Sequence, residues 1–141
     1  MSFRTVKEGD SFDLGGVTLE IYDCPGHTQG GICILDKQDR VLFTGDSINR
    51  HCWMQLEEST SLEEFYESLD RLSFLTGQYD YILCGHTENL DTASLYEEHK
   101  AAVKEVIDQV GRDEDEYYDY FGGTCKIHNY TKGNVGIVYR E

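Results

Sequence analysis

The sequence VLFTGDS at residues 41–47 places a short apolar, β-type run before a glycine and then a carboxylate, Asp46. Two other stretches repeat this arrangement with histidine, because LEIYDCPG leads into His27 and YILCG leads into His86. Glycine precedes all three polar residues, and its missing Cβ lets the backbone turn sharply there. If the apolar runs are strands of one sheet, we expect the three side chains to lie together at the strand ends.

Imidazole and carboxylate groups are ligands that suit zinc, iron or manganese. A single Gly-Asp or Gly-His pair is usually an ordinary turn, since glycine and aspartate are common turn residues. Three such pairs, each at the end of an apolar run, are a more specific signal. We therefore predict that His27, Asp46 and His86 form a metal site at one edge of a sheet.

The ordered motifs CPGHT, VLFTGDS and ILCGHT resemble the later motifs of the metallo-β-lactamase superfamily, and the resemblance runs from about Val6 to the C-terminus. It implies that Asp46 bridges two metal ions, with His27 bound to the first ion and His86 to the second. The ions implied are one or two zinc ions, with iron or manganese as alternatives. Thr28 and Thr87 would either orient these ligands or stabilise turns.

The resemblance also implies a function for the intact family domain. A bound metal lowers the pKa of a coordinated water, and the resulting hydroxide attacks the substrate. The expected activity is hydrolysis of an ester, thioester, lactone or related bond in a small-molecule substrate, with Asp46 as the catalytic carboxylate.

One departure from the family is large. The family carries an earlier motif, His-x-His-x-Asp-His, which does not occur in this sequence. Residues 1–141 therefore resemble the C-terminal half of a metallo-β-lactamase-like domain, a fragment with an incomplete metal site. The expected fold is α/β (α+β): half of a four-layer αββα sandwich, with one mostly antiparallel or mixed sheet and two helices on one face. We expect this fragment to be inactive alone, and to associate as a homodimer or with the missing N-terminal half.

Two alternatives to a hydrolase fragment stay open. The chain could be a non-catalytic half-domain that acts only by self-association. It could also be a structural zinc module in which Cys24, His27, Cys84 and His86 bind one ion. The Cys-x-His spacing of that module is tighter than in usual structural zinc sites, and it leaves Asp46 without a role.

The composition narrows the class of partner. A formal charge of −15 argues against binding to nucleic acid, whose phosphates require basic partners, and against anionic membrane surfaces. The sequence has no apolar run near 20 residues and no signal peptide, so we expect a soluble, cytoplasmic protein. In that setting the five cysteines are expected to be free thiols.

Apolar periodicity predicts the main elements. Hairpins are expected around the turns at residues 15–16 and 36–39. A helix over about residues 62–76 would begin at Ser61, with Glu64 completing a capping box.

A second helix is expected over about residues 92–110, with His99 exposed to solvent among charged neighbours. The acidic run at residues 112–119 is typical of a solvated loop. Closing strands are expected at residues 124–128 and 134–139, with a structural or surface role favoured for His128. Residues 48–60, which include His51 and Trp53, either form a surface loop or line a substrate pocket.

Overall fold

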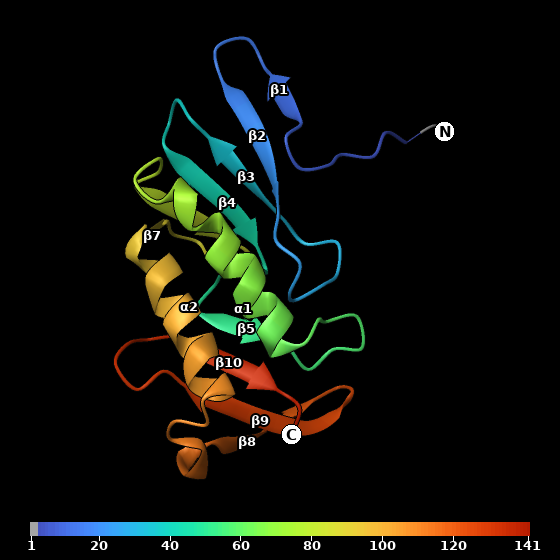
Figure 1. Ribbon diagram of the computed structural model, residues 1–141, viewed down its shortest axis with the longest axis vertical. Coiled ribbons are helices and arrows are strands. Elements are labelled where there is room, and N and C mark those ends of the chain that lie inside the picture. The colour runs from blue at the N-terminus through green and yellow to red at the C-terminus, as the bar shows by residue number, and fades with distance from the viewer. Residues whose placement is uncertain (1–2) are drawn as a thin grey trace.

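The computed structural model describes residues 3–141 (Figure 1). The elements follow one another as β1 (Ser11–Asp13), β2 (Thr18–Asp23), β3 (Ile32–Asp36), β4 (Val41–Gly45), β5 (His51–Trp53), α1 (Leu62–Arg71), β6 (Tyr81–Cys84), β7 (Asp91–Thr92), α2 (Ser94–Ile107), β8 (Glu116–Tyr120), β9 (Gly123–Asn129) and β10 (Gly136–Tyr139). No helix within this range has the length and apolar character needed to cross a membrane.

The strands form two mixed sheets. A six-stranded sheet has the order β1-β2-β3-β4-β6-β7, in which only β4 and β6 pair in parallel. A four-stranded sheet has the order β5-β10-β9-β8 and lies at the other end of the molecule (Figure 1). The predicted α/β class is confirmed. The expectation of one sheet was wrong, because the closing strands pair with β5 and not with β4 or β6.

Both predicted hairpins are present. β1 pairs with β2 around Gly15 and Gly16, whose positive φ angles of 84° and 119° suit glycine. β3 pairs with β4 through a turn in which the Asp36 carboxylate accepts hydrogen bonds from the backbone of Gln38 and Asp39, both at 3.0 Å. This local hydrogen bonding fixes the turn that leads into β4, the strand that precedes Asp46.

Helix α1 begins as predicted. The Ser61 hydroxyl accepts a hydrogen bond from the Glu64 backbone, and the Glu64 carboxylate accepts one from the Ser61 backbone. The α-helix ends at Arg71, and a 3₁₀ turn over Leu72–Leu75 completes the predicted span. In Figure 1, α1 and α2 lie side by side in front of the strands, and α2 reaches from β7 to the second sheet, which it contacts at β9 and β10.

Burial on the large sheet alternates along β3, β4 and β6. Cys33, Leu35, Leu42 and Ile82 are at most 1% exposed and join the core beneath the helices. The residues between them point to the opposite face, where Ile34, Phe43 and Leu83 lie side by side in register and are only partly covered. The structure thus fixes which alternate set is inward, a choice that the sequence left open.

Three local predictions were wrong. His99 is fully buried, because it lies on the apolar face of α2 with Leu95 and Val103. The acidic run contains β8, which pairs with β9 along its whole length. Part of the expected loop at residues 48–60 is β5, which pairs in parallel with β10.

Candidate metal centre

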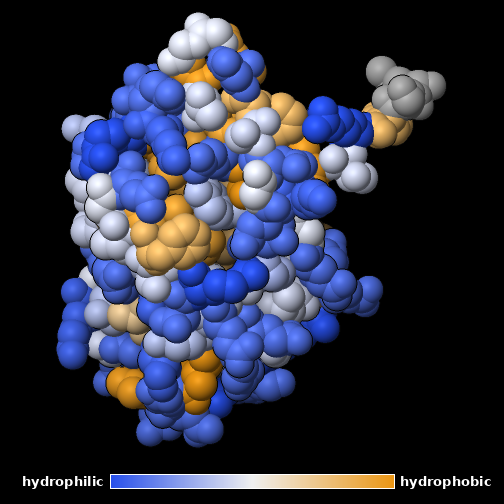
Figure 2. All heavy atoms as spheres, turned by 45° about the horizontal axis from the view of Figure 1, so that its top comes forward, coloured by the Kyte–Doolittle hydropathy of each residue, from blue (hydrophilic) through white to orange (hydrophobic). Residues whose placement is uncertain are grey.

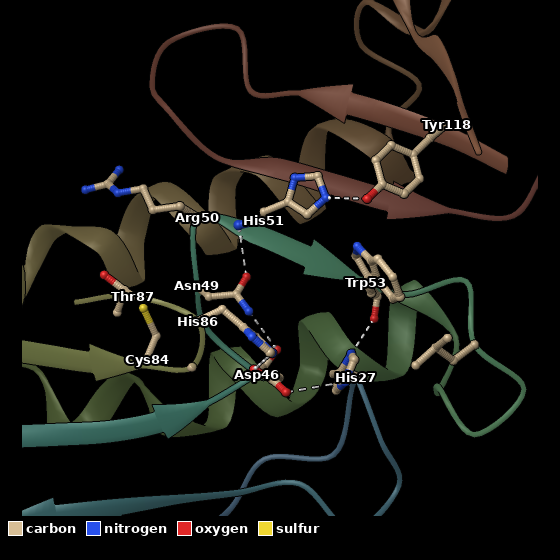
Figure 3. Close-up of a pocket in the computed structure, with 12 residues that line it drawn as sticks. His27, Asp46, Asn49, Arg50, His51, Trp53, Cys84, His86, Thr87 and Tyr118 are labelled. Atoms are coloured by element: carbon tan, nitrogen blue, oxygen red, sulfur yellow. Dashed lines mark hydrogen bonds and ion pairs between the residues drawn. The ribbon is translucent and has the colours of Figure 1, made fainter. Parts of the chain in front are cut away.

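The predicted ligands follow β2, β4 and β6. β2 and β4 are both antiparallel to β3, and β6 is parallel to β4, so these three strands run in one direction. Their carboxyl ends therefore meet at one edge of the sheet. His27, Asp46 and His86 lie at that edge and line one pocket (Figure 3).

Asp46 stands between the two histidines. Its Oδ2 is 3.9 Å from His27 Nε2, and its Oδ1 is 3.3 Å from His86 Nε2. Two ligands each about 2.1 Å from a tetrahedral zinc lie about 3.4 Å apart, so each histidine has nearly the right separation from one carboxylate oxygen to share an ion with it. Within residues 3–141 no three His, Cys, Asp or Glu side chains converge on a single ion position. The geometry is one of two ligand pairs that share a carboxylate.

The His27 ring is oriented by a hydrogen bond on its other nitrogen. Nδ1 lies 2.6 Å from the carbonyl oxygen of Trp53 and donates to it, and Nε2 faces Asp46 (Figure 3). The Ser59 hydroxyl donates to the His27 carbonyl at 2.8 Å. Such contacts are typical of histidines that bind metal, because they set the tautomer and the ring direction.

His86 is held less firmly. Its side chain is 85% exposed, and its φ of 60° places it in the left-handed region. Thr87, which follows it, exchanges hydrogen bonds with the backbone of Asn89, so its hydroxyl stabilises the local turn. No hydrogen bond from the Thr28 hydroxyl is present within the described chain to decide its role.

The three glycines before the ligands serve different purposes. Only Gly45 has a positive φ, 53°. A Cβ at Gly26 would lie 2.1 Å from Cδ2 of Phe65, and a Cβ at Gly85 would lie 2.1 Å from Oδ1 of Asp46. Glycine is therefore required for a turn at Gly45, for the close approach of the Phe65 ring at Gly26, and for the close approach of the Asp46 carboxylate at Gly85.

These approaches predict different effects for two matched substitutions. Gly26→Ala should lower the free energy of unfolding by about 1–3 kcal/mol, because the buried Phe65 ring cannot move away freely. Gly85→Ala should leave stability nearly unchanged but displace Asp46, and so weaken zinc binding about 10- to 100-fold. Urea denaturation and calorimetric zinc titration of both variants check this. Wild-type zinc affinity in Gly85→Ala would contradict the placement of Asp46.

The pocket has a volume of about 580 Å³. Besides the predicted ligands, its walls include His51, Trp53 and Tyr118. The interpretation of residues 48–60 as pocket-lining is therefore supported for His51 and Trp53. The sequence did not predict Tyr118 as a pocket residue, because the acidic run at residues 112–119 was interpreted as a solvated loop.

The four residues of the alternative zinc module do not converge within residues 3–141. Cys24 is fully buried, and the Cys84 thiol is directed at Asp91, with Sγ 3.9 Å from Oδ2. Burial raises the pKa of Cys84, which disfavours the thiolate that zinc requires. All five cysteines are free, as predicted, and all five are buried. His128 is 1% exposed and does not line this pocket, so the surface position that the sequence allowed for it was wrong.

Sequence comparison gives matches over most of the chain. The metallo-beta-lactamase superfamily profile matches residues 2–103. The hydroxyacylglutathione hydrolase of Brucella ovis is 34% identical over 112 residues, which cover 77% of this chain and 43% of that protein. The chain thus spans less than half the length of the curated relatives it matches, and these relatives are hydrolases.

Solved structures show the same fold. A metallo-beta-lactamase family protein from Thermus thermophilus superposes with a TM-score of 0.61 at 24% identity, over 79% of this chain and 38% of that one. ETHE1 from Myxococcus xanthus gives a TM-score of 0.56 at 24% identity, over 70% of this chain and 44% of that one. By its sequence motifs, its profile match and its fold, the chain belongs to the metallo-β-lactamase superfamily.

Proposed function

We propose that this chain supplies half of the metal-binding side chains of a hydrolase that cleaves an ester, thioester, lactone or related small-molecule bond. The observation that carries the proposal is Asp46, whose two carboxylate oxygens each face a different histidine, His27 on one side and His86 on the other. A carboxylate suits a shared position because each of its oxygens can accept one cation.

The donor set fits one or two zinc ions. The missing Cβ of Gly85 leaves the space that the Asp46 carboxylate occupies, and the Trp53 carbonyl holds His27 in the tautomer that can bind a metal. When bound, zinc polarises the scissile carbonyl and lowers the pKa of water. The chain's own contribution is to place one oxygen of Asp46 beside each histidine and to keep the Nε2 lone pair of His27 available.

The similarity to hydroxyacylglutathione hydrolases supports a hydrolase of which this chain is a part. Two protein ligands for each ion are fewer than the three that a catalytic zinc usually has. We therefore propose that full activity requires further ligands, from the N-terminal half of such a domain, and that this chain alone has little turnover.

Zinc titration tests the ligand assignment. We expect the wild-type chain to bind zinc weakly and Cys24→Ala to bind it equally well. Asp46→Ala should lower the zinc affinity by more than the 10- to 100-fold that is lost when a residue supporting a ligand is removed. Isothermal calorimetry on the folded proteins measures this. Tight, stoichiometric binding that survives Asp46→Ala but is lost in Cys24→Ala would instead establish the cysteine-based module.

A second candidate role, association without catalysis, is favoured by the sheet face opposite the helices. Ile34, Phe43 and Leu83 form a continuous apolar row there. On the different face that Figure 2 shows, hydrophilic side chains predominate and apolar side chains appear in separate patches. Soluble monomers rarely leave a broad apolar sheet face uncovered.

We expect a homodimer at micromolar concentration, formed sheet to sheet about a two-fold axis. Light scattering after size exclusion measures the mass. Phe43→Glu should convert the dimer to a monomer, whereas Lys37→Glu, in the exposed β3–β4 turn, should not. A wild-type monomer that fails to bind a hydrophobic dye would refute the dimer.

A further inference from the structure

Two strands at opposite edges of the small sheet bring aromatic rings to one face. Trp53 in β5 is in register with Val138, Val138 with Ile127, and Ile127 with Glu116 in β8. Residues two and four positions after Glu116 share its face, so Tyr118 and Tyr120 lie on the face that carries Trp53. The sheet curls enough for contact, because the Trp53 ring centroid is 6.1 Å from that of each tyrosine.

His51 completes this surface. Its Nε2 is 3.2 Å from the Tyr118 hydroxyl, and the two ring centroids are 5.3 Å apart (Figure 3). Burial lowers the pKa of His51, so the ring is neutral near neutral pH. We call His51, Trp53 and Tyr118 the aromatic wall. It lines the same pocket as the candidate ligands, and the Trp53 backbone carbonyl contacts His27 directly.

Within the described chain, the pocket has no free cation opposite this wall. Arg50 is the only lysine or arginine among the described residues that line it. Its guanidinium is neutralised by two carboxylates, with Nη2 2.7 Å from Asp91 and Nη1 2.9 Å from Glu98. Asp46 adds a negative charge inside the pocket, and the whole chain carries −15. In the metal-free chain, an anionic group placed at this wall would therefore meet repulsion.

We infer that the aromatic wall binds an uncharged, apolar or aromatic portion of the substrate, and that the wall itself offers no cation to a negatively charged group. This inference rests on the proposed hydrolase function and specifies its substrate class. The wall depends on β8, which lies beyond residue 103, where the superfamily match ends.

The chain contains its own reporter for this site, because Trp53 is its only tryptophan. We would titrate the metal-free chain, in the presence of a chelator, with phenylacetamide and with phenylacetate, which differ mainly in charge. Phenylacetamide should change the Trp53 emission in a saturable manner. Phenylacetate should bind about tenfold more weakly, the effect of two unit charges roughly 10 Å apart at an effective dielectric constant of about 20.

Two neighbouring tyrosines provide a matched pair of variants. Tyr118→Ala should weaken phenylacetamide binding about two- to tenfold, the range expected for one lost aromatic contact. Tyr117→Ala should leave binding unchanged, since Tyr117 is 74% exposed on the opposite face and packs on Lys126. Tyr118→Phe keeps the ring and should bind as the wild type does. Circular dichroism confirms that each variant is folded.

Equal or tighter binding of phenylacetate would overturn the inference, as would unchanged binding in Tyr118→Ala. The titration uses neither zinc nor turnover. If zinc binding proves independent of Asp46 while the charge discrimination persists, the hydrolase proposal fails and the assignment of the aromatic wall stands. If zinc binds as proposed but the two probes bind alike, the aromatic wall fails alone.

Discussion

Replacement of His128 by alanine is expected to lower the free energy of unfolding by about 3–5 kcal/mol, the range found when one partner of a buried ion pair is removed. The ring is 1% exposed and lies between two carboxylates. Nδ1 is 2.7 Å from Asp115 Oδ1, and Nε2 is 3.1 Å from Glu105 Oε2. Each ring nitrogen thus faces one carboxylate, and through the contact with Glu105 the ring joins β9 to α2.

Alanine would leave the Asp115 carboxylate, 3% exposed, without its imidazole partner, although the Tyr139 hydroxyl still donates to it at 2.7 Å. Urea denaturation measures the loss. Asn129→Ala, an exposed neighbour in β9, serves as the control and should change stability by less than about 0.5 kcal/mol. Asp115→Asn combined with His128→Leu should recover part of the loss, because it removes both charges. A cost below about 1 kcal/mol for His128→Ala would show that water replaces the imidazole.

The second large effect that we expect is a loss of stability at acidic pH. His99 is completely buried, and its burial lowers the pKa of the imidazole from 6.5 to about 4. The Nδ1 donates to the Asn49 carbonyl at 2.9 Å, while Nε2 has no partner among the described residues. The folded state therefore holds a neutral ring.

Below pH 6.5 the unfolded chain takes up a proton that the folded chain does not, so stability falls as the pH falls. The expected loss is about 1.4 kcal/mol for each pH unit, or about 3 kcal/mol in all, and it stops near pH 4, where the folded ring also protonates. We would measure urea unfolding from pH 7 to pH 4 in the wild type and in His99→Gln. The variant should lack this slope whatever its own stability. Parallel pH profiles would contradict the prediction.

The candidate site was predictable because its signal is local. Each predicted ligand follows an apolar strand and a glycine, and the same-direction strands β2, β4 and β6 bring these ends together. The α1 start was equally local, since Ser61 and Glu64 lie three residues apart. The roles of His27, Asp46 and His86 as metal ligands stay a prediction.

The small sheet was not predictable in this way. β5 has only three residues, too few to show a pattern, and its partner β10 follows more than 80 residues later. In β8 the inward Tyr118 and Tyr120 alternate with the exposed Tyr117 and Asp119. The many acidic residues of this segment favoured a solvated loop, so the alternation was not used to predict a strand. His99 could have been found, because it lies four residues after Leu95 and four before Val103, on the apolar stripe of α2.

The pairing of β5 with β10 has a consequence for the order of events during synthesis. His27, Asp46 and His86 all leave the ribosome well before residues 136–139, yet the carbonyl that orients His27 belongs to Trp53 in β5. β5 pairs only with β10 in its sheet, and such long-range pairings form late in folding. A nascent chain stalled before β10 would contain His27, Asp46 and His86 without a fixed His27 ring. The nascent chain should therefore reach its full zinc affinity only after β10 has been synthesised and has paired with β5.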